Sequence, residues 1–159
     1  MTPMKRATVL LLLALGACTS SDPDPFPSLP ADPCALLSDR DVEVAMGTKV
    51  VRHAPADSHS PDGPALCEYY VGGGLGSLVV AVDPATITGF TTIRDDDIGT
   101  NKVVENLGDE AFERGEASLW VRVDEGYFVL GFQREWPDGA VHDLRTLADT
   151  ALGNIPARQ

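Results

Sequence analysis

The chain has 159 residues, of which 24 are acidic and 12 are basic, so its formal net charge is −12 at pH 7. A protein this anionic is repelled by the phosphates of nucleic acid and by anionic lipid headgroups, which excludes nucleic acid as a partner. The length suits one domain built around a single hydrophobic core.

Residues 1–17 have the layout of a secretory signal peptide. Lys5 and Arg6 precede an apolar run that ends at Ala17 and is shorter than the roughly 20 residues of a membrane-spanning helix. The end of the run, Leu15-Gly16-Ala17-Cys18, resembles a lipobox, which would make Cys18 the lipidated first residue of the mature protein. Cleavage at an ordinary Ala-x-Ala-like site is the alternative.

Residues 18–33 are rich in proline, serine and aspartate. Such a segment buries too little apolar area to offset the entropy of ordering, and its prolines favour an extended spacer. We therefore predict three parts: a signal peptide over 1–17, a lipidated Cys18 with a tether over 18–33, and one globular domain over 34–159. The predicted location is the extracytoplasmic face of the cell envelope, with attachment to the membrane through the lipid on Cys18.

The chain has three cysteines, and assigning Cys18 to lipid leaves Cys34 and Cys67 as a pair. In an oxidising compartment this pair can form one disulfide. Closing a loop of this size stabilises a fold by about 3–4 kcal/mol in the chain-entropy model. Reactive thiols or metal ligands are the alternatives, although neither cysteine lies in the Cys-x-x-Cys spacing typical of redox and zinc sites.

The first predicted element of the domain is a short helix over 39–46. Ser38 is a good N-cap, Asp41 stands at the third helical position of an imperfect capping box, and Gly47 ends the helix. Residues 49–53 are a candidate strand. Residues 54–64 contain several prolines and polar residues and are predicted to form a loop.

Two β-rich runs, 66–71 and 77–82, are joined by a glycine-rich connection and predict a hairpin. Alternation along the first run places three residues on the core side: Cys67, Tyr69 and Val71. Asp83 and Pro84 are then predicted to open a helix, supported by an apolar stripe of Ile87, Phe90 and Ile93 and weakened by Gly89 and four threonines.

The second half contains further strands and a helix. Residues 94–97 and 99–101 are predicted as a polar turn region, and short strands are predicted at 102–106 and 110–114. The clearest strands, 118–123 and 127–134, form a second hairpin, and the apolar spacing over 141–155 predicts an amphipathic helix. The predicted fold is α+β: a mainly antiparallel sheet built from two hairpins and packed by a short N-terminal and a C-terminal amphipathic helix.

Several short motifs carry a family resemblance. They are the lipobox with its tether, Asp32-Pro33-Cys34-Ala35-Leu36-Leu37-Ser38, Leu66-Cys67-Glu68-Tyr69, and Asn106-Leu107-Gly108-Asp109-Glu110-Ala111. With these motifs the chain resembles the small cell-envelope lipoproteins of unknown function with paired cysteines that are widespread in actinobacteria. It departs from them at Tyr69, where tryptophan is common. The resemblance implies a secreted, disulfide-closed α+β domain and supplies no activity.

One loop contains residue types that bind zinc or copper: His53, Asp57, His59 and Asp62. Its prolines favour an exposed loop instead. The acidic run 95–97 lacks the alternating ligands of a calcium loop, and the glycine-rich run 72–77 leads into a strand rather than the helix of a phosphate-binding loop. Metal binding therefore stays an alternative, and no cofactor is predicted.

No catalytic motif stands out. The chain has no Gly-x-Ser-x-Gly sequence, Ser118 and His142 have no local partners, and Asp109 and Glu110 would point to opposite faces of a strand. Aromatic residues of the sheet and its exit would line a groove if a face stayed uncovered: Tyr69, Tyr70, Trp120, Tyr127, Phe128, Phe132 and Trp136. We predict a lipid-anchored, non-catalytic binding or protein-interaction module; the alternatives are a small-ligand or metal carrier and a cell-wall hydrolase.

Overall fold

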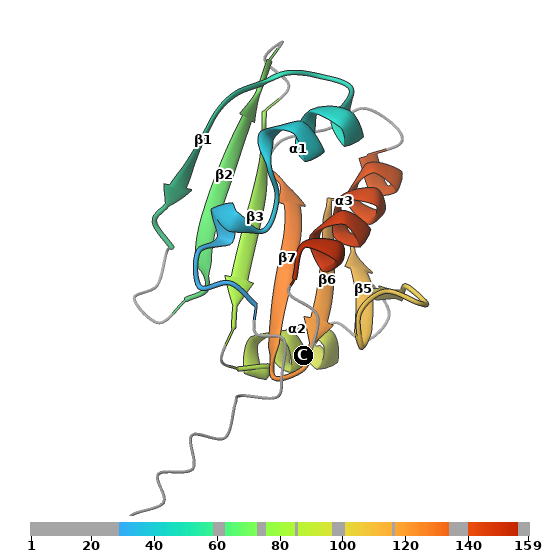
Figure 1. The fold of residues 1–159 in the computed structure, drawn as a ribbon. Coiled ribbons are helices and arrows are strands. Elements are labelled where there is room, and N and C mark those ends of the chain that lie inside the picture. The colour runs from blue at the N-terminus through green and yellow to red at the C-terminus, as the bar shows by residue number, and fades with distance from the viewer. Residues whose placement is uncertain are drawn as a thin grey trace, which may run out of the picture.

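The computed structural model describes residues 29–58, 63–72, 76–84, 86–96, 101–115, 117–133 and 140–155. These residues form one seven-stranded antiparallel sheet and three α-helices, which confirms the α+β class (Figure 1). The strands lie in the order β1-β2-β3-β7-β6-β5-β4, so β3 and β7 meet at the centre of the sheet.

The strands are β1 (Val50–Ala56), β2 (Ala65–Val71), β3 (Ser77–Asp83), β4 (Asn101–Val103), β5 (Glu110–Arg114), β6 (Ser118–Val123) and β7 (Gly126–Phe132). The helices are a 3-10 turn η1 (Pro33–Ala35), α1 (Asp39–Met46), α2 (Thr88–Asp96) and α3 (Ala140–Asn154). None of the helices in the described part of the chain is long and apolar enough to cross a membrane.

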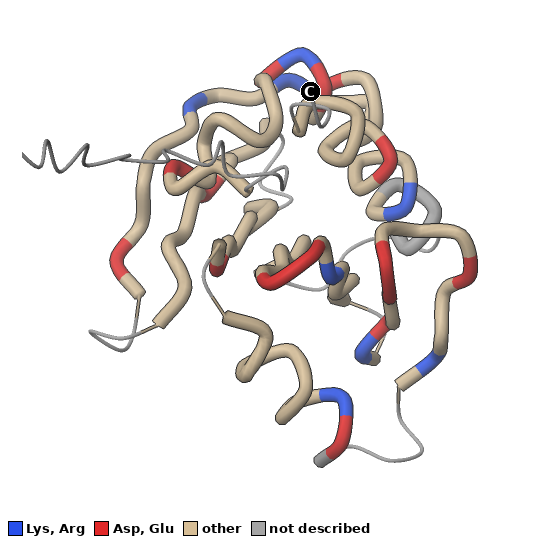
Figure 2. The backbone as a smooth tube through the Cα atoms, turned by 60° about the horizontal axis from the view of Figure 1, so that its bottom comes forward, with Lys and Arg blue, Asp and Glu red and all other residues tan. Residues whose placement is uncertain are grey.

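The helices cover both faces of the sheet. Figure 1 shows α1 and α3 on one face, here called the inner face, and Figure 2 shows α2 standing apart from them on the other, the outer face. The main hydrophobic core lies under the inner face and combines alternate strand residues with one stripe of α3. Its α3 members are Leu144, Leu147, Ala148 and Ala151. The prediction that Cys67, Tyr69 and Val71 face the core is confirmed, because all three are buried in this cluster.

Helix α1 begins and ends where the sequence predicts. The Ser38 hydroxyl accepts a hydrogen bond from the Asp41 N–H at 3.2 Å, and the Asp41 carboxylate accepts one from the Ser38 N–H at 2.8 Å. The capping box is therefore complete rather than imperfect. Gly47 ends the helix in the left-handed conformation, with φ of 63°. The hydrogen bonds from Ser38 lower the pKa of the Asp41 carboxyl.

We expect Ser38→Ala to lower the free energy of unfolding by about 1 kcal/mol, because a helix N–H loses its acceptor. The Asp41 pKa is depressed in the folded state, so the stabilisation is present above its unfolded value of 3.8 and lost as pH falls through the folded value. Urea titrations at neutral and acidic pH measure this. An equal difference between the two proteins at both pH values would contradict the capping role of the carboxylate.

Several element boundaries differ from the prediction: β2, β3 and α3 by one residue at one or both ends, and β7, which spans Gly126–Phe132 rather than 127–134. Strand β1 and helix α2 differ more. Strand β1 continues to Ala56 through Pro55, which was predicted to lie in a loop; as an edge strand, β1 tolerates a residue without an N–H. Helix α2 starts at Thr88 rather than at Asp83 and Pro84, because Asp83 still pairs with Tyr127 as the last residue of β3. The Asp83 carboxylate instead accepts a hydrogen bond from the N–H of Thr86 in the connection.

The region after α2 also differs. The helix continues to Asp96, and Asn101 already belongs to β4, although 94–97 and 99–101 were predicted as turns. Strand β4 is shorter than the predicted 102–106 and ends at Val103. The Asn101 amide donates to the carbonyls of Ile93 and Arg94, at 3.2 Å each, and so ties β4 to the last turn of α2.

Candidate functional site

The outer face of the sheet carries the alternate residues that the main core does not use. Helix α2 covers it over β5, β6 and β7 and inserts Phe90, which is fully buried. The Phe90 ring lies 5.0 Å from Phe112 and 6.1 Å from Tyr127, measured between ring centroids. Trp120 stacks between Phe112 and Tyr127, at centroid distances of 5.8 and 5.7 Å. These aromatic residues form a second, smaller core rather than an open groove.

Charged side chains hold the C-terminal end of α2. The Arg94 guanidinium contacts both oxygens of Glu110, at 2.8 and 3.0 Å, and its Nε donates to Asp95 at 2.8 Å. Arg122 lies 3.5 Å from the Glu110 carboxylate. The carboxylates raise the pKa of Arg94, and Arg94 lowers the pKa of Asp95. The acidic run at 95–97 is thus tied in part to an arginine; Asp97 lies outside the described residues.

A glycine allows α2 to approach the sheet closely. A side chain added at Gly89 would begin only 2.4 Å from the Tyr127 hydroxyl oxygen, which is closer than any real contact. The sequence presents Gly89 only as a weak point in the helix pattern. In the folded protein it is the position at which α2 contacts the buried Tyr127, whose pKa is raised by burial.

The half of the outer face over β1, β2 and β3 lies away from α2, and a polar group occupies it. This group, called the Glu68 cluster, consists of Arg52, Glu68, Tyr70 and Ser77. Arg52 pairs with Tyr70 across β1 and β2, and Tyr70 pairs with Ser77 across β2 and β3, so the three stand in one row. Glu68 lies two residues before Tyr70 on the same face of β2.

Hydrogen bonds fix the side chains of the Glu68 cluster. One carboxylate oxygen of Glu68 accepts from the Tyr70 hydroxyl and the other from the Ser77 hydroxyl, each at 2.5 Å. The Arg52 guanidinium carbon lies 4.1 Å from the centroid of the Tyr70 ring, which is cation–π geometry. The hydrogen bond to Glu68 raises the pKa of the Tyr70 hydroxyl, which is protonated at neutral pH and donates to the carboxylate. Ser77 is buried, whereas Arg52 is exposed.

An apolar strip runs beside the cluster along the two central strands. It consists of Val79 and Ala81 of β3 and Val129 and Gly131 of β7. Val79 pairs with Glu68 on one side and Gly131 on the other, and Ala81 pairs with Leu66 and Val129, so all of them share the outer face. Val79, Val129 and Gly131 are half-buried, Ala81 is buried, and Val129 packs against the aromatic core under α2. Small side chains therefore line the outer face of the sheet between the Glu68 cluster and Trp120.

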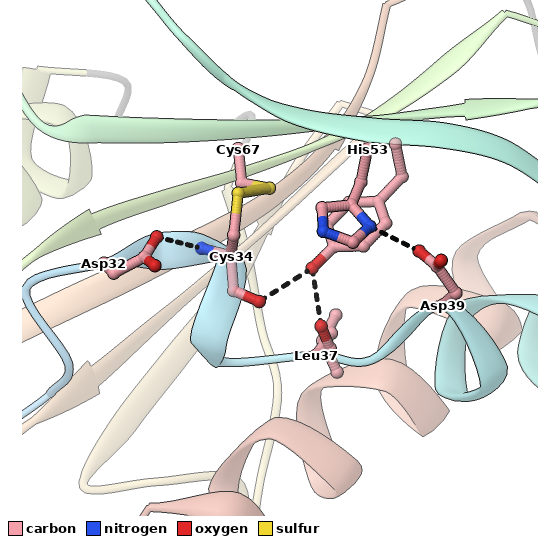
Figure 3. Close-up of a disulfide and its surroundings, with 7 residues drawn as sticks. Asp32, Cys34, Leu37, Asp39, His53 and Cys67 are labelled. Carbon is pink, nitrogen blue, oxygen red and sulfur yellow. Dashed lines mark hydrogen bonds and ion pairs between the residues drawn. A yellow bond between two sulfur atoms is a disulfide. The ribbon is translucent and has the colours of Figure 1, made fainter.

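The disulfide lies on the inner face and is confirmed. Cys34 and Cys67 are bonded, with their Cα atoms 5.1 Å apart (Figure 3). Tyr69, two residues after Cys67, donates from its buried hydroxyl to the carbonyl of Leu37 at 2.6 Å and approaches that of Cys34 at 3.4 Å. Burial raises the pKa of Tyr69. The bond and the tyrosine thus hold the segment that leads into α1 against β2.

The residues of the predicted metal loop are only partly described. His53 lies on β1, where its Nδ1 is 2.6 Å from Asp39 at the start of α1 and its ring centroid is 5.4 Å from that of Tyr69 (Figure 3). Asp57 is exposed, and His59 and Asp62 lie outside the described residues. Within the described ranges, no three His, Cys, Asp or Glu side chains are grouped to hold a metal ion.

The residues weighed for catalysis have structural contacts. The Ser118 hydroxyl donates to the Arg114 carbonyl at 3.1 Å, and the Asp109 carboxylate accepts from the Asp124 N–H at 2.6 Å. Glu110 takes part in the ion pairs under α2. The side chain of His142 and all of Trp136 and Cys18 lie outside the described residues.

Comparison of the chain with known protein families, curated proteins and solved structures gives no match. The resemblance to actinobacterial lipoproteins therefore rests on its motifs alone. The sequence did not indicate the Glu68 cluster, because its members come from three different strands. The only available signal was the alternation along β2, which places Glu68 and Tyr70 on the face opposite Cys67.

Proposed function

We propose that this protein is a lipid-anchored, non-catalytic binding module on the extracytoplasmic face of the cell envelope. The observation that carries the proposal is the arrangement on the outer face. The hydrogen-bonded polar side chains of β1, β2 and β3 lie away from α2, beside an apolar strip that meets the α2 core at Val129. In this proposal the hairpins β2–β3 and β6–β7, packed by α1 and α3, serve as the rigid scaffold of the binding face.

The beginning of the described chain supports the orientation this function needs. Leu29 is buried next to Gly126 and Pro84, at the end of the sheet where β3 leaves and the β6–β7 turn lies. In this proposal the tether joins the domain at this end of the sheet, so the outer face is not the point of attachment. The binding face is then accessible to other components of the envelope.

The anchor is tested by Cys18→Ala. We expect this variant to lose labelling by a fatty-acid probe and to move from the membrane fraction to the soluble fraction, because a cysteine thiol is the attachment point of the lipid. Ser20→Ala, two residues away in the tether, serves as the control and should remain in the membrane fraction. Persistent labelling of the Cys18 variant would contradict the lipobox.

The binding face is tested by placing a photoactivatable amino acid at Val79, in the apolar strip, and separately at Val44. Val44 is 73% exposed on α1, at the opposite side of the sheet. Irradiation of intact cells should give a covalent adduct from position 79 and none from position 44. Adducts from both positions, or from position 44 alone, would assign binding to another surface.

A further inference from the structure

We propose that the Glu68 cluster and the adjoining apolar strip bind a neutral glycan chain. This inference rests on the proposed function, since it names the ligand of the same face. It starts from the charges of the site: Arg52 and Glu68 carry one formal charge each, of opposite sign, so the cluster is neutral within a chain of net charge −12. An anionic ligand would meet Glu68 and a cationic ligand would meet Arg52, whereas a neutral ligand meets no repulsion.

The hydrogen-bonding capacity of the cluster fits hydroxyl groups. Each Glu68 oxygen accepts one hydrogen bond from within the cluster and has a second lone pair for an outside donor. The Arg52 guanidinium lies over the Tyr70 ring, and with five N–H donors it can also donate to an outside acceptor. In the described part of the chain, no carboxylate forms an ion pair with Arg52. Adjacent sugar hydroxyls can donate to Glu68 and accept from Arg52, and both bonds are charge-assisted.

The apolar strip supplies the complementary surface for the C–H faces of sugar rings. Its half-buried members nearest the Glu68 cluster are Val79 of β3 and Gly131 of β7, which pair with each other, whereas Ala81 is buried and Val129 packs against the α2 core. Across the sheet from β1 to β7 the site crosses three strand spacings of about 4.8 Å each, which gives room for a short stretch of glycan. The rigid row of strand residues presents the polar groups without loss of their own freedom, which favours binding.

A peptide strand is the competing occupant, and the sheet argues against it. Extended peptides bind sheets mainly by adding a strand to an exposed edge, where backbone groups are unpaired. The Glu68 cluster lies on the face, whose backbone groups are already paired between strands. The nearby edge strand, β1, contains Pro55 and a register shift between Val50 and Arg52, two features that oppose strand addition.

The test uses the full chain in detergent and isothermal titration with hexasaccharides: neutral xylo- and manno-oligosaccharides, anionic oligogalacturonate and cationic oligoglucosamine. We expect a neutral hexasaccharide to bind, and Arg52→Gln and Glu68→Gln each to weaken it about tenfold, as loss of a charge-assisted bond does. Arg40→Gln and Glu125→Gln, which change exposed charges elsewhere, should bind within about twofold of the wild type. Thermal unfolding of every variant shows whether it is folded; Arg52 is exposed, so its variant remains informative if Glu68→Gln unfolds.

Preference for the anionic or cationic sugar, or binding that the Arg52 and Glu68 variants leave unchanged, would overturn the glycan inference. Absence of glycan binding would also overturn the glycan inference, and so would a peptide adduct trapped at position 79. In both cases an adduct at position 79 would leave the proposed function standing. If position 79 traps nothing in intact cells and no hexasaccharide binds, both proposals fail. The two experiments therefore separate the failure of the ligand class from the failure of the binding face.

Discussion

Replacing both disulfide cysteines, Cys34→Ala with Cys67→Ala, is expected to lower the free energy of unfolding by roughly 2–5 kcal/mol. The bond closes a loop with a sequence separation of 33 residues, so its loss frees the unfolded chain and opens a gap beside the fully buried Cys67. The melting temperature should fall by about 10 °C or more. Guanidinium titration and calorimetry measure both quantities.

The control for this prediction is chemical reduction of the wild-type chain under mild denaturant, which breaks the same bond without the two substitutions. Reduced wild type and the double variant should lose similar stability. A double variant as stable as the oxidised wild type would show that the bond contributes nothing to the fold. Resistance of the wild-type cysteines to alkylation without reductant reports that the bond is formed.

Tyr69→Ala is expected to lower the free energy of unfolding by about 3–5 kcal/mol. The side chain is fully buried, and its hydroxyl donates to the Leu37 carbonyl, so the substitution leaves both a cavity and an unpaired buried acceptor. Tyr69→Phe separates the two effects, because it keeps the ring and removes the hydroxyl; it should cost about 1–3 kcal/mol. Urea denaturation of the three proteins gives the comparison. A Tyr69→Phe variant as stable as the wild type would contradict the role of the hydroxyl.

Tyr69 and the disulfide are expected to act on the same segment. Cys67 is bonded to Cys34, and Tyr69 contacts the carbonyls of Cys34 and Leu37, so each restrains the chain that leads into α1. Combining Tyr69→Phe with the cysteine variant should therefore show a coupling of about 0.5–3 kcal/mol rather than simple addition. Phe128→Leu, in the core under β7, offers a matched control that should add nearly independently.

Local sequence patterns were sufficient for the elements whose signals lie within a few residues. Ser38, Asp41 and Gly47 defined α1 because caps act through neighbouring backbone groups. The run that became β5 was predicted as a short strand, and alternation predicted the run that became β6; both have the predicted bounds. The same alternation placed Cys67 and Tyr69 on the core side, which made their burial predictable.

The predicted boundaries failed where a partner distant in sequence decides the conformation. Asp83 and Pro84 have the local pattern of a helix start, but pairing with Tyr127 of β7 keeps Asp83 in the sheet. Pro55 has the local pattern of a loop, but the sheet edge accepts it. Gly89 weakens the helix pattern by itself, and only the approach of Tyr127 explains why the position has no side chain.

The sequence by itself determined the α+β class, the pairing of Cys34 with Cys67 and the core face of β2, because caps, cysteine number and alternation are local or countable properties. Only the tertiary structure decided the candidate site. The register of β1 shifts between Val50 and Arg52, which turns Arg52 toward Tyr70 and leaves Val51 71% exposed. Ser77 joins Glu68 through the pairing of β3 with β2. Register between strands depends on bulges and on packing of the whole sheet, which no short stretch of sequence contains.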